Sequence, residues 1–266
     1  KVMMDLLRIR IKDRSMLRLI DLWLHAGVME DGVRTYPETG SPQGAVISPL
    51  LSNVYLHYVL DDWVEKVVRP RMRGEMHLIR YADDVVFCFQ YRDDAERVRK
   101  ALEGRLAKHG LKLNAEKTKL IEFGRFAEVN AHRRGGRPET FDFLGFTHIC
   151  GKSRKGKFLV QRKTAAKRLR RSMKRVAEWC RDNRHLPMEE QHQQMSAKLR
   201  GHYNYYGLTG NLRSLKRMAW HAKRTWKKWL DRRSQRGRMP WQRFEKVLAR
   251  YPLPEPRILR WKDLAA

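Results

Sequence analysis

The stretch LIRYADDVVFCF, residues 78–89, constrains the fold more than any other part of the sequence. Two runs rich in β-branched and aromatic residues stand on either side of Asp83 and Asp84, and such runs favour strands. A short polar break between them predicts an antiparallel hairpin with both carboxylates at or beside its turn. The acid pair by itself indicates either turn chemistry, since aspartate bonds nearby backbone amides, or a hard-cation site that relieves the repulsion between two acids.

Other helix and strand signals surround this hairpin, so the first part of the chain is expected to mix α and β structure. Start signals, among them a cap at Ser48 with Pro49 at the first helical position, and glycine stops predict three helices: DRSMLRLIDLWLHAG (13–27), SPLLSNVYLHYVLDDWVEKVV (48–68) and DDAERVRKALEGRLAKHG (93–110). Runs with strand composition predict four strand segments: LIRYA (78–82), VVFCF (85–89), KLIEFG (119–124) and TFDFLGF (140–146).

After residue 160 the apolar residues recur at helical spacing. This predicts three helices that form a small bundle, with a shorter fourth helix from Trp241. The residues that carry the pattern are Leu169, Met173, Val176 and Cys180, then Met195, Leu199, Tyr203 and Tyr206, then Leu212, Leu215, Ala219, Ala222, Trp226 and Trp229.

The charge of the chain is concentrated in this second part. Of 58 Lys and Arg and 29 Asp and Glu, 25 and 21 lie in residues 1–150, so 33 and 8 follow residue 150. A net charge of +29, most of it in the helical part, points to a polyanionic partner, and nucleic acid is the first candidate. The change in charge near GKSRKGK, residues 151–157, marks a domain boundary.

Membrane insertion, secretion and disulfide scaffolds are not expected. No apolar run approaches the ~20 residues that cross a bilayer, and the first residues, KVMMDLLRIR, lack the apolar core of a signal peptide. The three cysteines, Cys88, Cys150 and Cys180, are widely spaced, which argues for small core residues over disulfides or a cysteine-based zinc site. We therefore expect a soluble protein of the cytoplasm.

A second motif, GSPQGAVISPLLSN at residues 40–53, precedes the acidic hairpin by about 40 residues. Its glycines and a following helix start would let the backbone approach a base or phosphate closely, and the Gln43 amide can donate and accept hydrogen bonds there. A Gly/Pro loop before a helix is ordinary when it stands alone. Its position before the acidic hairpin makes it a candidate binding element.

These motifs in this order resemble a known family. GSPQGAVISPLLSNVYL, LIRYADDVVFCF, HGLKLNAEKTKLIEFG and FDFLGF are similar to the palm of the reverse transcriptases encoded by bacterial group II introns, which also act as splicing maturases; LRGHYNYYG at residues 199–207 resembles their maturase-specific thumb. The resemblance covers nearly the whole chain. It implies an α+β fold, with a partial polymerase palm in residues 1–155 and an all-α, basic thumb and maturase domain in residues 156–266.

The resemblance assigns chemistry to the hairpin and to nearby residues. Asp83 and Asp84 match catalytic carboxylates that help to hold two Mg²⁺ ions for in-line nucleotidyl transfer. Tyr81 and Ala82 match the residues before them that keep the approach to this hairpin narrow and border the substrate and template. Lys117 matches a lysine proposed to protonate the pyrophosphate leaving group, although a solvated strand-edge lysine explains it equally well. The implied substrates are a dNTP and an RNA/DNA duplex.

Three residues of the SPQG motif are template-binding candidates by the same resemblance. Gln43 matches a residue placed near the template and the incoming nucleotide, and Pro42 and Gly44 shape the loop around it. FDFLGF matches the primer-grip region, and its aromatic residues are also suited to the core of a hairpin.

The helical domain is implied to grip group II intron RNA and the RNA/DNA duplex. Lys and Arg would neutralise phosphates, so the affinity should weaken with salt. Tyr203 and Tyr206 are expected in the core, and Trp226 and Trp229 have the same simple explanation. The RNA-contact candidates are Arg200, His202, Tyr205, Lys223, Arg224 and Lys227.

The chain departs from the family pattern at one motif. An earlier F-x-D-I-x-x-F-F-D segment, which supplies a further catalytic aspartate, is absent from these 266 residues, and Asp5 is a poor substitute. We therefore expect a C-terminal portion, from a truncated frame or completed by a split N-terminal partner, that does not polymerise alone.

Two other functions compete with this interpretation. One is an RNA-binding splicing factor that uses the basic domain without catalysis. The other is a palm-type nucleotide cyclase, which the SPQG motif and the basic domain disfavour.

Overall fold

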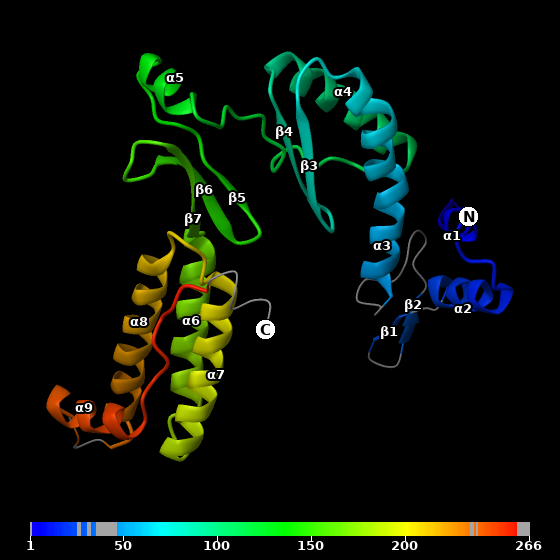
Figure 1. Cartoon of the computed structure of the whole chain (residues 1–266). Coiled ribbons are helices and arrows are strands. Elements are labelled where there is room, and N and C mark those ends of the chain that lie inside the picture. The colour runs from blue at the N-terminus through cyan, green and yellow to red at the C-terminus, as the bar shows by residue number, and fades with distance from the viewer. Residues whose placement is uncertain are drawn as a thin grey trace. The chain divides into compact units, whose positions relative to one another are not determined.

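The computed structural model describes residues 2–25, 28–30, 33–35, 47–234, 237 and 239–259. The chain forms two compact units, Lys1–Leu120 and Ile121–Ala266, and each is considered by itself. Antiparallel sheets with helices are followed by a helical region, which confirms the predicted α+β class (Figure 1). The domain boundary at 155/156, which rests on family resemblance, falls in the turn between two paired strands and stays a prediction.

The first unit is built around the predicted hairpin. Its helices and strands are α1 Val2–Arg8, α2 Arg14–His25, β1 Val28–Glu30, β2 Val33–Thr35, α3 Ser48–Leu56, β3 Met76–Tyr81, β4 Asp84–Phe89 and α4 Arg92–Lys108. The helix that begins as α3 continues through two π-helical segments, His57–Asp61 and Val64–Val68, and a 3₁₀ turn at Arg69–Arg71. The helix α2 begins as predicted, because the Asp13 carboxylate accepts hydrogen bonds from the amides of Ser15 and Met16.

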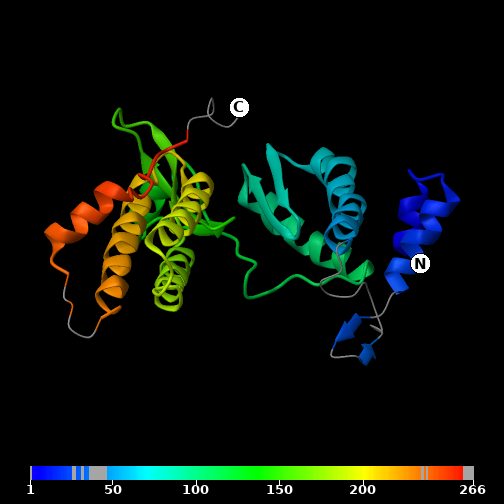
Figure 2. The same cartoon turned by 90° about the horizontal axis from the view of Figure 1, so that it is seen from below.

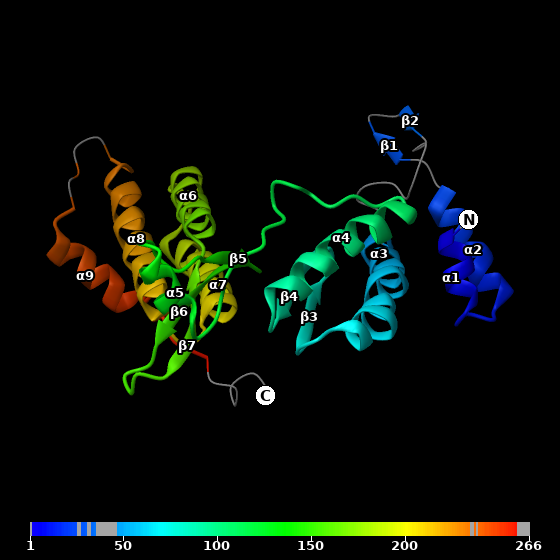
Figure 3. The ribbon, with the colours of Figure 1, turned by 90° about the horizontal axis from the view of Figure 1, so that it is seen from above.

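The hairpin β3–β4 packs on this long helix and on α4 (Figure 3). Side chains alternate along a strand, so Met76, Leu78 and Arg80 point one way, while Ile79 and Tyr81 are exposed on the other face. The apolar residues of the packed face form a core with Val59, Leu60, Val64 and Val68 of the helix and Val98, Leu102 and Leu106 of α4.

Two details of the sequence interpretation are wrong. The helix α3 contains Ser48 as its first residue, and its cap is Ile47, a shift of one position at a helix end. The segment KLIEFG is not a strand. Its amides bond side chains instead of a partner strand: the Glu122 amide donates to a Glu139 carboxylate oxygen and the Gly124 amide to Cys150 Sγ.

The second unit joins a three-stranded sheet to a helical bundle. Its elements are α5 Ala127–Arg133, β5 Phe141–Phe143, β6 Phe146–Lys152, β7 Phe158–Thr164, α6 Ala166–Asp182, α7 Met188–Tyr206, α8 Leu212–Asp231 and α9 Trp241–Arg250. The strands pair antiparallel in chain order. The predicted bundle of three helices and the shorter fourth helix are confirmed (Figure 2).

The bundle core contains the apolar residues that the spacing selected, apart from Leu212, which is 37% exposed. The buried polar residues Gln191 and Asn211 are hydrogen-bonded. Trp226 is fully buried, and its Nε1 donates to the Gln191 amide oxygen at 2.9 Å. Buried Asn211 accepts from the Thr164 amide and donates to the Tyr206 carbonyl, so it ties the end of β7 to the α7–α8 connection. In the described part of the chain, no helix is both long and apolar enough to span a membrane.

The packing predicts a large cost for truncating a core side chain of α7. Leu199 is completely buried, so Leu199→Ala should lower the free energy of unfolding by roughly 2–5 kcal/mol through lost burial and a cavity. Urea unfolding followed by tryptophan fluorescence will report mainly on this unit, because six of the eight tryptophans follow residue 121. The neighbouring exposed variant Arg200→Ala should change the value by less than about 0.5 kcal/mol; equal effects would contradict the core assignment.

Candidate functional site

The two predicted catalytic aspartates lie at the tip of the β3–β4 hairpin. Tyr81 pairs with Asp84 across the strands, so Ala82 and Asp83 form a two-residue turn. Ala82 has a φ of 53°, a left-handed conformation that glycine usually occupies in such turns. Both carboxylates are exposed, and neither has a hydrogen-bond or ion-pair partner among the described residues. The hairpin therefore presents four unpaired carboxylate oxygens from a strained turn.

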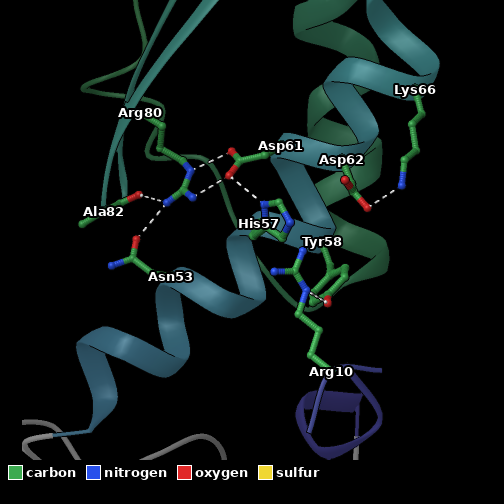
Figure 4. Close-up of polar contacts among 9 residues, drawn as sticks. All are labelled: Arg10, Asn53, His57, Tyr58, Asp61, Asp62, Lys66, Arg80 and Ala82. Atoms are coloured by element: carbon green, nitrogen blue, oxygen red, sulfur yellow. Dashed lines mark hydrogen bonds and ion pairs between the residues drawn. The ribbon is translucent and has the colours of Figure 1, made fainter. Parts of the chain in front are cut away.

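Arg80 holds this turn against the long helix (Figure 4). Its Nε and Nη2 donate to the two carboxylate oxygens of Asp61 at 2.7 and 2.6 Å. Its Nη1 donates to Asn53 Oδ1 at 2.9 Å and to the carbonyl oxygen of Ala82 at 3.1 Å. One guanidinium thus connects two helix residues to the strained residue of the turn, and the fork geometry fixes its orientation.

The helix supplies the partners of Arg80 because of its local shape. Asn53 and Asp61 are eight residues apart, about two helical turns, so both can face the hairpin. Asp61 ends the first π-helical segment, and such segments often occur at functional sites. His57 Nδ1 lies 3.5 Å from an Asp61 oxygen. On the same helix, Tyr58 accepts from Arg10 and Asp62 from Lys66 (Figure 4).

The Arg80–Asp61 pair is largely shielded from water. The Arg80 side chain is 15% exposed and that of Asp61 is 25% exposed. Hydrogen bonding to Asp61 raises the pKa of Arg80, so the guanidinium stays charged at any physiological pH. A guanidinium that is fixed and paired with Asp61 therefore lies at the base of the turn that carries Asp83 and Asp84.

The donor set of the turn fits part of a Mg²⁺ site. Mg²⁺ favours one or two carboxylates with waters and phosphate oxygens, and Asp83 and Asp84 offer two carboxylates with free lone pairs. Within the described ranges, no group of three His, Cys, Asp or Glu side chains could hold a metal. A third protein ligand would come from outside them.

The other palm candidates are less well connected to this turn. Tyr81 is 65% exposed on the open face of the hairpin, next to Ile79. Lys117 is exposed in a turn where its amide donates to the carbonyl of Asn114, and no contact among the described residues links its side chain to the aspartates. Pro42, Gln43 and Gly44 lie outside the described residues.

A second hairpin turn is held by tyrosines of α7. Phe143, Leu144, Gly145 and Phe146 form the turn between β5 and β6, with φ of 49° at Leu144 and 77° at Gly145. The hydroxyl of Tyr205 donates to the Leu144 carbonyl at 3.0 Å, and its ring stacks on Phe146. A side chain at Gly145 would be strained and crowded, because its φ is left-handed and an added Cβ would lie 3.0 Å from the Tyr206 hydroxyl.

The RNA-contact candidates of the helical unit differ in their surroundings. Arg200, Lys223 and Arg224 are exposed. Lys227 forms an ion pair with Asp231 at 2.8 Å, with side chains only 13% and 24% exposed. His202 contacts the rings of Tyr203 and Tyr206, and burial lowers its pKa to about 4. Tyr205 is engaged with Leu144, as described above.

The sequence interpretation missed Arg80, Asp61 and Asn53. One signal was available: strand alternation places Arg80 on the same face as Met76 and Leu78, and a cation on an apolar face requires a partner. The identity of that partner depends on which side of the helix packs on the hairpin, which is a tertiary property.

Comparisons with known proteins match both units. Residues 3–148 match the family model described as reverse transcriptase (RNA-dependent DNA polymerase), and residues 169–248 match the one described as group II intron, maturase-specific domain. Over 62 residues the chain is 42% identical to the group II intron-encoded protein LtrA of Lactococcus lactis, which covers 23% of this chain and 10% of that protein.

Two further relatives show similarity. An uncharacterized 91 kDa protein in the cob intron of Schizosaccharomyces pombe is 40% identical over 62 residues, 23% of this chain and 8% of that protein. Protein YkfC of Escherichia coli is 30% identical over 190 residues, 60% of this chain and 45% of that protein. The chain spans less than half of the length of each of these relatives.

The shielded ion pair predicts that Arg80 controls the order of the aspartate turn. Arg80→Met removes both hydrogen bonds that Asp61 accepts from the guanidinium and should lower the free energy of unfolding by about 3 kcal/mol. Arg80→Lys should lose the two-point hydrogen bond to Asp61. In both variants amide hydrogen exchange at residues 81–85 should become faster, about tenfold for each 1.4 kcal/mol of lost local stability. Arg99→Met, which removes an exposed pair with Glu103, should leave these amides unchanged. Unchanged amide hydrogen exchange at residues 81–85 in both Arg80 variants would rule out that Arg80 holds the turn in place.

The buried imidazole of His202 predicts an acid-sensitive bundle. An unfolded histidine has a pKa near 6.5 and the folded one about 4, so between these values the unfolded chain binds a proton that the folded chain does not. The contribution of the neutral His202 to the free energy of unfolding is complete above about pH 6.5. It decreases by roughly 1.4 kcal/mol per pH unit as the pH falls toward 4. His202→Gln should reduce the slope of unfolding free energy against pH between 5 and 6. The exposed His185→Gln should not, and equal slopes in all three proteins would disprove the prediction.

Proposed function

Because the chain belongs to the reverse transcriptase family and carries a group II intron maturase-specific domain, we propose that it is the polymerase-palm and maturase portion of a bacterial intron-encoded protein. Residues 1–155 would present catalytic carboxylates to a primer terminus and a dNTP. Residues 156–266 would hold intron RNA and the RNA/DNA duplex. A soluble, cytoplasmic location would suit such a partner.

One observation supports the proposed polymerase activity: the carboxylates of Asp83 and Asp84 are exposed, without hydrogen-bond partners among the described residues, on a turn that Arg80 fixes. When bound, Mg²⁺ would supply charge neutralisation for nucleotidyl transfer. The residues of this chain would do the rest: Asp83 and Asp84 would provide carboxylate oxygens at one point in space, and Arg80 would keep that point fixed through the Ala82 carbonyl. Lys117 would donate a proton to the pyrophosphate leaving group.

We propose that the catalytic set found among the described residues is incomplete by itself. Reverse transcription of this kind needs a third carboxylate, and the described residues place none beside Asp83 and Asp84. We therefore propose that the 266 residues do not polymerise unaided, and that a segment with the further aspartate, covalently joined or as a separate partner, completes the site.

The helical unit supports the RNA half of the proposal through its charge. Residues 151–266 hold 33 Lys and Arg against 8 Asp and Glu, and lysine and arginine contacts to phosphates supply most of the affinity of such proteins for nucleic acid. The exposed Arg200, Lys223 and Arg224 are the contact residues that we propose first. His202 and Lys227 would act through packing and ion pairing, since both are mostly covered.

The lack of a third carboxylate beside Asp83 and Asp84 among the described residues also favours a second function. With two carboxylates and a strongly basic bundle, the chain could serve as an RNA-binding splicing factor that makes no use of Asp83 and Asp84. Metal binding at the hairpin separates the two functions, because only the polymerase site requires it.

The proposal predicts that metal binding and RNA binding are separable. In Asp83→Asn with Asp84→Asn, paramagnetic broadening of the amide signals of residues 81–85 by Mn²⁺ should disappear, because no carboxylate remains in the turn. Filter binding to group II intron RNA should stay within about twofold, since the affinity comes from the basic unit. The control, Glu96→Gln with Glu103→Gln on α4, removes two exposed acids from the same unit and should keep the broadening.

The outcomes distinguish the candidates. Broadening in the wild type favours the polymerase-type site, and its absence favours the splicing factor. A wild-type chain that shows no saturable binding to intron RNA would refute both.

Primer extension tests the incomplete catalytic set. The isolated 266-residue chain with Mg²⁺, dNTPs and a primed RNA template should extend no primer, because the described residues supply no third carboxylate. Robust synthesis that is lost in Asp83→Asn would show that the described residues, or those beside them, already provide a full site.

A further inference from the structure

One tryptophan of α8 is exposed without a packing role. Trp220 is 58% exposed, more than any other tryptophan among the described residues; Trp241 follows at 49%. The other two tryptophans of α8 are used in packing: Trp226 is fully buried, and Trp229 packs on the bundle core. Burial therefore accounts for two of the three rings and leaves the third unexplained.

Four cations surround Trp220 on the helix surface. Lys216 and Arg217 stand four and three residues before it, and Lys223 and Arg224 three and four residues after it, which are the positions that neighbour a residue on a helix. All four are exposed. No ion pair with an acid involves any of them in the described part of the chain, and α8 has no acidic residue before Asp231.

The tryptophan and one of these cations are already in contact. The guanidinium carbon of Arg224 lies 5.1 Å from the centre of the Trp220 ring, within the range of a cation–π interaction. By contrast, Lys227 near the C-terminus of α8 is neutralised by Asp231. The acid-free part of α8 thus combines an open aromatic face with charges that nothing in the described chain compensates.

We infer that Trp220, with Arg224 beside it, is a stacking site for an unpaired base of an RNA strand whose phosphates are neutralised by Lys216, Arg217 and Lys223. This deepens the proposed function and rests on it. A base offers a flat π surface that stacks on an indole or a guanidinium, and the adjoining phosphates match the ring of cations. Bases inside a duplex are already stacked on each other, so the site selects single-stranded segments such as loops or bulges.

The test compares two RNAs against the full chain. Binding of a labelled oligoadenylate and of a blunt RNA duplex is measured by fluorescence anisotropy at fixed salt. Trp220→Ala should weaken oligoadenylate binding by roughly 5- to 100-fold, the usual effect of losing one stacked base, and duplex binding by less than about twofold. Trp220→Phe keeps an aromatic face and should recover most of the affinity.

Matched variants separate stacking from charge and from folding. Trp241→Ala removes the next most exposed tryptophan among the described residues and should leave oligoadenylate binding unchanged. Lys223→Gln should reduce the slope of log affinity against log salt by about 0.7, as expected for one lost phosphate contact on a single strand, whereas Trp220→Ala should keep the wild-type slope. Trp220→Gln is a second variant with a polar side chain suited to an exposed helix position, and circular dichroism verifies that each variant is folded.

Specific results would overturn the inference. Wild-type affinity for oligoadenylate in folded Trp220→Ala or Trp220→Gln would do so, as would equal losses for oligoadenylate and duplex. Either result leaves the proposed function standing if the wild type still binds intron RNA. Absence of RNA binding by the wild type would instead refute the proposed function and the stacking site together.

Discussion

The two-point hydrogen bond between Arg80 and Asp61 is the interaction on which the candidate active site depends. The hairpin that carries Asp83 and Asp84 has only two strands, and an isolated two-stranded hairpin is at best marginally stable in water. Apolar packing on the long helix and on α4 stabilises its base. Near the tip that packing gives way to the ion pair, so the position of the carboxylates follows from a charged contact instead of from the core.

The same solution to backbone strain occurs twice in the molecule. Among the described residues other than glycine, only Ala82 and Leu144 have positive φ, and each lies in the turn of a hairpin. In each case the carbonyl of the strained residue accepts a hydrogen bond from a side chain, Arg80 in the first turn and Tyr205 in the second. Strained turns persist where surrounding contacts determine them, and here one long side chain provides that contact at each site.

The helical unit separates its aromatic residues into two kinds. Trp226 and its hydrogen bond to buried Gln191 belong to the core, where loss of a polar partner would leave an unsatisfied group. Trp220 lies outside that core, in the acid-free part of α8. The contrast accounts for a chain that is both well packed and strongly basic: apolar spacing fills the interior, and the remaining helix positions carry cations for an anionic partner.

The sequence alone determined the acidic hairpin and the longer helices, because local propensity, capping and apolar spacing act over a few residues. It did not predict the short helices α1 and α5 or the strand β7. The hairpin at Asp83 and Asp84 and the helices α6 to α9 were predicted on these grounds. Where the outcome depended on partners distant in the sequence, local signals were not enough: the segment KLIEFG, predicted as a strand, is not one. The hydrogen bond from Tyr205 to Leu144 was not foreseen either, and the RNA contact of Tyr205 stays a prediction. Only the tertiary structure decided that Arg80 meets Asp61 and Asn53, because long-range pairing depends on how a hairpin packs on a helix, which no local pattern encodes.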